Sequence, residues 1–347
     1  MSTLRGAPGR ATIREVAARA GVSVKSVSRV INAEPSVSPE LAARVHVAIT
    51  ELGYRHNLAA SNLRRRGQRT LSLGVVIQDI SNPFAASVLR AVEEVALRRR
   101  VVVLASSIDA DPQRERQVVD ELLRRRVDGM ILMPTTVDHR QYADEHHRGV
   151  PFVFVDRPPV ALDADYVGSD NIGGSREAVA ALIRRGHRRI GYIGDTRSIS
   201  TAIERLEGYR QALAAAGLDE RPDLVVQDVN SPGRAERAVH DLLAVAEPPT
   251  ALFTAQNLVT IGALRVLRGW GLRGRIAHIG FDDVELGELL EPGVSAVCQS
   301  PAEIGRTAAE LVFARLDGST EPAQRRIVQV QLVERGSGEL APVRSVV

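Results

Sequence analysis

From Leu71 onward, the sequence alternates between short runs rich in β-branched and aliphatic residues and longer segments with helical spacing of apolar residues. The runs that predict strands are 71–77, 101–106, 127–134, 151–156, 188–195, 223–228, 250–255 and 275–282. The amphipathic segments that predict helices are 84–100, 112–126, 175–186, 204–217, 235–246 and 260–271. Such a series forms parallel sheets covered by helices on both faces. This many strands are better placed in two similar sheets than in one.

The segment 12–32, TIREVAARAGVSVKSVSRVIN, has the layout of a helix-turn-helix. Thr12 and Glu15 have the spacing of a capping box, and Gly21 supplies the left-handed residue that a tight turn requires. Ser23 can cap the second helix. The apolar residues that would face inward are Val16, Ala17, Ala20, Val27, Val30 and Ile31. The outer face of the second helix is then free to present side chains to DNA base edges.

Basic charge is concentrated in the same part of the chain. Residues 1–70 carry twelve Arg and Lys against four Asp and Glu, whereas the whole chain has a formal net charge of only +3. Lys25, on the outer face of the second predicted helix, is the only lysine in the sequence. A general preference for arginine would explain the residue type but not its segregation. Basic charge beside a helix-turn-helix is typical of binding to a phosphate backbone.

Several classes of protein are disfavoured by what the sequence lacks. A single cysteine, Cys298, excludes a disulfide framework and fits a reducing cytoplasm. The N-terminus has no apolar signal core, and no run approaches the ~20 apolar residues that span a membrane. The motifs of nucleophilic, phosphate-binding, dinucleotide-binding and zinc-dependent enzymes are absent. We therefore expect a cytoplasmic protein that is not an enzyme and uses no cofactor or metal.

Ordered motifs along nearly the whole chain resemble the LacI/GalR family of bacterial transcription regulators. They are ATIREVAARAGVSVKSVSRVIN, GYRHN, DISNPF, VDR, RGHRRIGYIG, ERLEGYRQAL, IGFDD and the Gln299-Ser300-Pro301 crossover. The resemblance implies an all-α helix-turn-helix headpiece and a two-lobed α/β sensor like periplasmic sugar-binding proteins. It also implies a homodimer that sets two headpieces on the half-sites of a near-palindromic operator. The expected divisions are headpiece 1–56, hinge helix and linker 57–70, N-lobe 71–168 plus about 298–325, and C-lobe 169–297 plus about 326–347.

For the headpiece, the resemblance implies two kinds of DNA contact. Val24, Lys25 and Arg29 would read base edges, with a phosphate contact as the alternative for Arg29. The phosphate contacts that set register would come from Thr12, Ser23, Ser26, Ser28 and Asn32. In the hinge, Leu63 would wedge into the minor groove, while Ala59 and Ala60 are small enough for two hinge helices to approach. The alternative for Leu63 is simple packing within a linker.

For the sensor, the positions of interest lie beyond the carboxyl ends of the strands, where open α/β sheets bind ligands. By resemblance, the sugar-contacting residues there would be Asp79, Asn82, Phe84, Asp156, Arg157, Arg205, Gln256, Asp282 and Gln299. Solvated surface charge is the ordinary alternative. Carboxylates accept from hydroxyls, guanidinium groups donate and amides do both, so the set suits a monosaccharide or polyol. Gln256-Asn257 departs from the family's usual Asn-Asp.

The sequence therefore predicts a repressor whose operator affinity is controlled by a small effector, a sugar or polyol, bound between two lobes. Ligand would close the lobes and separate the hinge helices, although some relatives use ligand as a co-repressor and sequence does not display the sign. Two alternatives stay open. One is the same regulator with a purine or other metabolite as effector. The other is a sugar transport receptor, against which the basic headpiece argues.

Overall fold

The computed structural model describes residues 11–31, 34, 36–54 and 69–343, and the chain divides into two compact units between Thr70 and Leu71. The first unit is the headpiece and the second is the sensor. Asn32, Ala60, Leu63 and most of the predicted hinge lie outside the described residues. The DNA contacts expected of these residues therefore stay predictions.

The headpiece contains α1 (Ile13–Ala20), α2 (Val24–Ile31) and α3 (Pro39–Glu51). Thr12 and Glu15 close the predicted capping box at the start of α1, and Gly21 takes a left-handed conformation with φ of 64°. Ser23 Oγ accepts from the backbone N–H of Ser26 at 3.1 Å, as expected of a helix cap. The three helices enclose a small core made of Val16, Ala17, Ala20, Val27, Val30, Val45 and Ala48.

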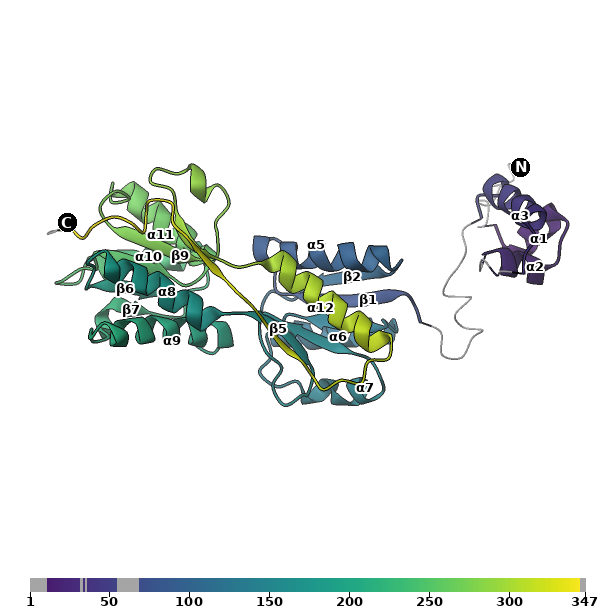
Figure 1. The fold of residues 1–347 in the computed structure, drawn as a ribbon, viewed down its shortest axis with the longest axis horizontal. Helices are drawn as coiled ribbons and strands as arrows, with labels where there is room; N and C mark the ends of the chain where they lie inside the picture. The colour runs from purple at the N-terminus through teal and green to yellow at the C-terminus, as the bar shows by residue number, and fades with distance from the viewer. Residues whose placement is uncertain (1–10, 32–33, 35, 55–68, 344–347) are drawn as a thin grey trace, which may run out of the picture. The chain divides into compact units, whose positions relative to one another are not determined.

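The first lobe of the sensor is a parallel six-stranded sheet with the strand order β11-β5-β4-β3-β1-β2. Its strands are β1 (Ser72–Ile77), β2 (Val102–Ser107), β3 (Gly129–Leu132), β4 (Phe152–Val155), β5 (Asp165–Ser169) and β11 (Arg325–Val328). Alternate residues of β1 face opposite sides of the sheet. Leu73, Val75 and Ile77 pack beneath α5 (Pro83–Arg98) and α12 (Pro301–Leu316), which lie side by side in Figure 1. Val76 packs on the other side with α6 (Pro112–Arg124) and the η1–α7 segment (Arg140–Tyr142, Ala143–His147).

The second lobe repeats this plan with the strand order β12-β10-β9-β8-β6-β7. Its strands are β6 (Ile190–Ile193), β7 (Val225–Val226), β8 (Ala251–Thr254), β9 (Ala277–Phe281), β10 (Ser295–Cys298) and β12 (Gln331–Val333). Helices α8 (Asn171–Arg184) and α9 (Ser200–Ala215) share one core with the sheet, and α10 (Pro232–Leu243) and α11 (Asn257–Gly269) share another. Single 3₁₀ turns lie at Pro222–Leu224 and Gly287–Leu289. Within the described strands, only the β10–β12 pair is antiparallel, so the prediction of two parallel sheets holds with this exception.

The chain passes between the lobes three times, as Figure 1 shows. The passages fall between β5 and α8, between β10 and α12, and between β11 and β12. Because β11 pairs with β5, the last passage follows Val328, at the end of the range 323–328 in which the family resemblance implies a crossing. Strands β5, β10, β11 and β12 and helix α12 were not among the elements that the periodicity predicts.

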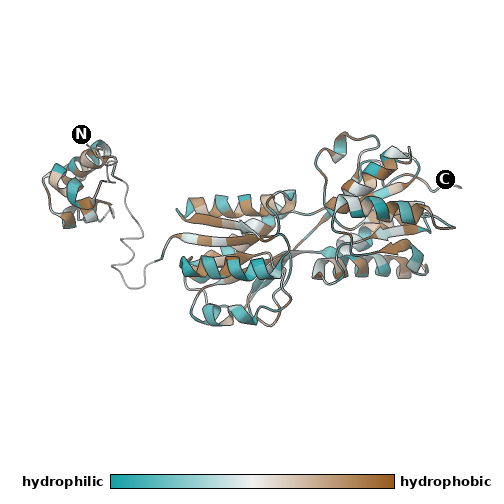
Figure 2. Cartoon of the chain, turned by 180° about the vertical axis from the view of Figure 1, so that it is seen from behind, coloured by the Kyte–Doolittle hydropathy of each residue, from teal (hydrophilic) through white to brown (hydrophobic). Residues whose placement is uncertain are grey.

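The hydropathy of the sensor follows its layers. Figure 2 shows apolar strands between helices whose outward faces are hydrophilic. Among the described residues, no helix combines the length and apolar character needed to cross a membrane.

Candidate effector site and DNA-binding surface

A cavity of about 370 Å³ lies between the two lobes, at the carboxyl ends of the strands. All nine residues that the sequence predicts line it: Asp79, Asn82, Phe84, Asp156, Arg157, Arg205, Gln256, Asp282 and Gln299. Polar residues that the sequence does not predict also line it, namely Gln78, Asp109, Asp195, Thr196, Thr201, Asn230 and Asn257. The volume is within the range of about 300–1,000 Å³ that small-molecule sites occupy.

Two aspartates occupy matching positions in the two lobes. Asp156 follows β4 and Asp282 follows β9, and both have left-handed backbones, with φ of 67° and 70°. Each donates its backbone N–H to the neighbouring strand, to Val167 O and Val297 O respectively, at 3.0 Å. Left-handed aspartates are uncommon and cluster at functional sites. The conformation sets both carboxylates in the lining of the cavity, with side chains only 13% exposed.

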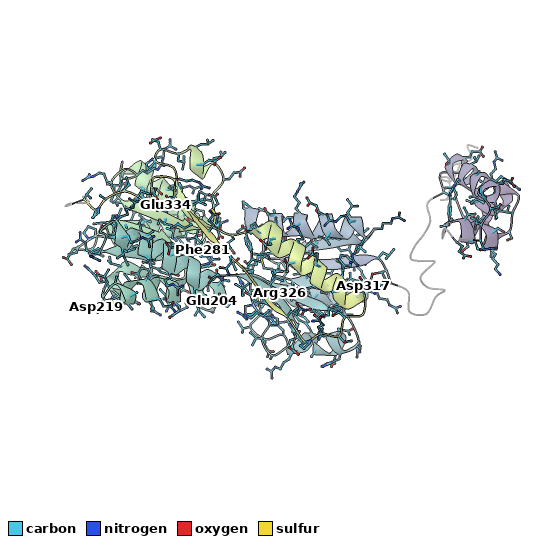
Figure 3. The ribbon with its side chains drawn as sticks, viewed as in Figure 1. Glu204, Asp219, Phe281, Asp317, Arg326 and Glu334 are labelled. Carbon is cyan, nitrogen blue, oxygen red and sulfur yellow. The ribbon has the colours of Figure 1, made fainter. Side chains whose placement is uncertain are left out.

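Arg205 is anchored from several sides. Its Nε donates to Asn171 Oδ1 at 2.9 Å and one terminal nitrogen donates to Ala255 O at 2.8 Å. The guanidinium carbon lies 3.9 Å from the ring centroid of Phe281, which Figure 3 labels at the end of β9. Asp282 Oδ2 is 3.7 Å away. Arg205 lies on the second turn of α9, because α9 begins at Ser200, four residues earlier than the sequence suggests.

Arg157 is held more loosely. One of its terminal nitrogens donates to Pro134 O at 3.0 Å, and Nε lies 3.6 Å from Asp156 Oδ2, which is beyond hydrogen-bond distance. Nε is buried and has no hydrogen-bond partner among the described residues. The side chain is only 11% exposed, so an unpaired donor in this position is suited to a ligand oxygen.

The loop that supports Arg157 is fixed by a buried carboxylate. Glu115 of α6 is fully buried and accepts from the backbone N–H groups of Thr135 and Thr136, from Thr136 Oγ1 and from Tyr142 Oη. Thr135 directly follows Pro134, whose carbonyl holds Arg157. Glu115 therefore positions Arg157 without itself lining the cavity.

Amide side chains connect the remaining groups. Gln299 donates to Asp282 Oδ1 and accepts from Ser169 Oγ, while Gln256 donates to Asp195 Oδ2 at 2.9 Å. These bonds orient the carboxylates of Asp282 and Asp195. Gln256 Oε1 is buried without a partner in the described part of the chain, which leaves an acceptor for a hydroxyl.

A hydrogen bond between two helix starts also joins the lobes across the site. Asn257, the first residue of α11, donates from Nδ2 to Asn82 Oδ1 at 3.2 Å. The same oxygen of Asn82 accepts from Phe84 N and caps α5. The two amides therefore connect the N-terminus of α5 in the first lobe to the N-terminus of α11 in the second.

Burial and charge act in opposite directions on the Asp156–Arg157 pair. Burial raises the pKa of the Asp156 carboxyl, and Arg157 and Arg205 oppose that rise. Burial also lowers the pKa of the Arg157 guanidinium, against the effect of Asp156. A ligand that supplies hydrogen bonds without adding negative charge fits this balance, since the cavity already holds more carboxylates than guanidinium groups.

Of the predicted DNA contacts that the structure describes, some are exposed and others are already engaged with neighbouring side chains. Val24 is 36% exposed, and Lys25 and Ser23 are exposed on or next to the first turn of α2. Arg29 pairs with Glu34 at 3.1 Å and also donates to Ser36. Thr12 Oγ1 donates to Glu15 within the capping box, and Ser26 Oγ bonds to Ser23 Oγ. Ser28 is half-buried on α2.

Some of the cavity residues that sequence reasoning missed had a detectable signal and others did not. Asp195 ends the predicted strand 188–195, so the strand-end rule could have found it. Asn257 directly follows the predicted residue Gln256, so the same strand end indicates it. Asn230 lies in the loop between β7 and α10, and nothing in its local pattern indicates a site. Among the described residues, no group of three His, Cys, Asp or Glu side chains could hold a metal ion.

The sequence and the structure both match known proteins. The pattern described as "Bacterial regulatory proteins, lacI family" matches residues 12–57, and that of a "Periplasmic binding protein-like domain" matches 179–338. The transcriptional regulator CelR of Thermobifida fusca is 36% identical over 95% of this chain and 98% of its own length. A solved CelR–cellobiose complex is 33% identical, covers 95% of this chain and 100% of its own, and has a TM-score of 0.70.

A more distant structure shows the same fold. The lac repressor dimer bound to operator and the anti-inducer ONPF is 24% identical, covers 96% of this chain and 100% of its own, and has a TM-score of 0.84. A helix-turn-helix headpiece joined to a two-lobed α/β sensor defines the class of DNA-binding transcription regulators to which these matches belong. The chain belongs to the lacI family of bacterial regulatory proteins, whose members matched here are transcriptional regulators and not enzymes.

Proposed function

We propose that this regulator is a repressor that binds a near-palindromic operator as a homodimer and responds to a neutral sugar bound between its lobes. The observation that carries the proposal is the cavity, in which two left-handed aspartates, two buried arginines and six amide side chains converge from both lobes. Such a set offers many acceptors and few free positive charges. It suits a ligand whose surface is covered with hydroxyl groups.

Each group has a role in the proposal. Arg157 and Arg205 donate to ring or hydroxyl oxygens, and Asp156 and Asp282 accept from hydroxyls. Phe84 supplies an apolar face for the sugar ring. The buried Nε of Arg157 and Oε1 of Gln256 are complementary, one donor and one acceptor. Asp79, Asn82 and Gln299 complete the set that we propose as ligand contacts.

The kind of sugar is suggested by two observations. The volume of about 370 Å³ accommodates a monosaccharide or a disaccharide. The CelR structure, a relative at 33% identity, is a complex with cellobiose. Glucose and cellobiose are therefore the first probes, and pentoses, polyols, sugar acids and purine nucleosides are the comparison set.

Allosteric control follows if the two lobe arrangements differ in how they hold the headpieces. Ligand contacts both lobes, so it favours whichever arrangement brings the two sets of groups together. We propose that this arrangement has the lower operator affinity. The lobe division 71–168 plus about 298–325 against 169–297 plus about 326–347 belongs to the same proposal, with the last passage placed after Val328.

For the headpiece, we propose that Val24 and Lys25 read base edges and that Thr12, Ser23, Ser26, Ser28 and Asn32 contact phosphates. Glu34 pairs with Arg29, so Arg29 reads a base only if DNA displaces Glu34. We therefore favour the alternative for Arg29, a phosphate contact. Leu63, with Ala60 beside the partner hinge, wedges into the minor groove. Lys25→Ala should relax preference at one position per half-site, whereas equal weakening on every sequence would make Lys25 a phosphate contact.

The test is a thermal-shift screen of the full chain followed by operator release. A ligand at about a hundred times its dissociation constant stabilises the folded protein by about 2.7 kcal/mol. We expect a shift with a neutral sugar, and release of operator DNA by that sugar in fluorescence anisotropy. A shift with purines alone would contradict the sugar proposal. Tighter DNA binding with sugar would contradict the proposed sign.

A further inference from the structure

The ends of the sensor helices differ in the type of residue that takes the left-handed position. The second residue after α7, α8, α9, α11 and α12 is a left-handed glycine, namely Gly149, Gly186, Gly217, Gly271 and Gly318. The same position after α5 and α6 is an arginine. Arg100 has φ of 58° and Arg126 has φ of 57°.

This conformation disfavours any residue with a side chain, and glycine is its usual occupant. A cation at the end of a helix does gain from the helix dipole. Arg98 and Arg99 already supply that charge at the end of α5, and Arg124 and Arg125 supply it at the end of α6. The dipole therefore gives no reason to place a third arginine at the strained position. An unfavourable backbone that occurs twice points to a role for the side chains.

Both arginines lie at the amino edge of the first sheet. Val102 N donates to Leu71 O at 2.9 Å, and Asp128 N donates to Ser72 O at 2.8 Å, so β2 and β3 start on either side of β1. Strands are about 4.8 Å apart in a sheet, which places the starts of β2 and β3 roughly 10 Å from each other. In Figure 1, α5 and α12 end toward the edge of the lobe at which β1 begins.

The charge at this edge is only partly neutralised. All six arginines of 98–100 and 124–126 are exposed. Arg99 pairs with Asp317, labelled in Figure 3, and Glu121 pairs with both Arg124 and Arg125. Asp128 lies at the same edge and accepts from Ser72 N. Arg98 and Arg100 have no ion-pair partner among the described residues.

We propose that this basic edge, residues 98–100 and 124–126, binds the phosphate backbone of double-stranded DNA in addition to the headpiece. The edge lies beside Leu71, the first residue of the sensor after the headpiece unit, because Val102 N donates to Leu71 O and Asp128 N donates to Ser72 O. Arginines spaced across an exposed edge neutralise phosphates without reading sequence. The inference rests on the proposed DNA binding and adds a second, sequence-independent contact to it.

The experiment compares full-length variants on a duplex of random sequence. Arg100→Gly with Arg126→Gly removes two charges and installs the residue that the backbone prefers. We expect weaker binding and a slope of log K against log salt that is shallower by about one for each phosphate that the variant no longer neutralises. The thermal midpoint should stay the same or rise. The matched control is Arg185→Gln with Arg188→Gln, two exposed arginines that precede β6 in the second lobe, and it should leave the slope unchanged.

The outcomes separate the inference from the function on which it rests. An unchanged slope in the glycine variant would overturn the basic edge while leaving operator binding by the headpiece intact. If the slope falls equally for the control, the change in net charge explains the effect, and this result would also overturn the basic edge. If the glycine variant melts at a lower temperature than the unmodified chain, Arg98→Gln provides the test instead, because this substitution changes no left-handed position. An unchanged salt slope for Arg98→Gln would then refute the inference. No DNA binding by the unmodified chain would refute the proposed function itself.

Discussion

The two lobes of the sensor offer similar groups to the cavity but fix them differently. Each contributes a left-handed aspartate and an arginine. In the second lobe, Arg205 is held by Asn171, by Ala255 O and by the ring of Phe281. In the first lobe, Arg157 has a single hydrogen bond within the described part of the chain, to a loop carbonyl that depends on Glu115. The second lobe is therefore the preorganised half of the site, and the first lobe is the half that a ligand completes.

The largest difference should appear when each arginine is removed. Arg205→Ala leaves Asn171 Oδ1 and Ala255 O buried without donors, so we expect a loss of about 4 kcal/mol of unfolding free energy together with ligand binding. Arg157→Ala should cost about 1–2 kcal/mol of stability. Denaturant unfolding and calorimetric titration with the sugar found in the screen measure both. Equal destabilisation by the two substitutions would break the comparison.

Acid should affect the second lobe more strongly than the first. Burial lowers the pKa of His278 in β9 to about 4, so the folded chain keeps this side chain neutral while the unfolded chain protonates it near pH 6.5. Stability is then full above pH 6.5 and falls as the pH drops toward 4, by up to about 3 kcal/mol. The pKa of His139 in the first lobe is also lowered by burial. His278→Gln should flatten the pH dependence of unfolding more than His139→Gln does.

The dependence of Arg157 on Glu115 can be measured directly. Glu115→Gln places an amide N–H₂ against backbone donors and should reduce stability by about 2 kcal/mol and sugar affinity by roughly tenfold. A structural effect alone would lower affinity equally with or without Arg157. In the Arg157→Ala background we expect Glu115→Gln to have little further effect on affinity, because the two residues act through one contact. Additive losses would contradict the positioning role.

The smallest effect concerns the bond between the lobes. Asn257→Ala removes one neutral hydrogen bond, worth about 1 kcal/mol, and should speed release of the sugar about fivefold. Stopped-flow release rates compare Asn257→Ala with the unmodified chain. An unchanged rate for Asn257→Ala would remove this bond from the account of lobe closure.

The strand-end rule and the family resemblance together indicated residues of the cavity, but local patterns did not reveal the whole fold. All nine residues predicted in this way line one cavity, and their contact with a ligand stays a prediction. Strand β5, with the sequence DYVGS, and strand β10, with SAVC, are too short and polar for periodicity to reveal. The crossing after Val328 depends on pairing with a distant strand, which no local pattern encodes.

The sequence also did not predict which charged side chains pair with one another or become buried. Arg29 stands on the outer face of α2 as predicted, but Glu34 across the following loop engages its guanidinium. Glu115 has the pattern of an ordinary charged residue in an amphipathic helix. Its burial follows from backbone donors that the loop at Thr135 and Thr136 brings to it.

The packing of α12 against α5 has a consequence for how the chain is made. Arg99 at the end of α5 pairs with Asp317, 218 residues further along. While a ribosome synthesises the chain, α5 and β1 emerge early, yet the helix that covers their apolar side emerges only after the entire second sheet apart from β12. The first lobe, although it begins first, therefore lacks α12 and β11 until nearly all of the second lobe has been synthesised. During that interval its uncovered apolar surface is available to chaperones and to self-association.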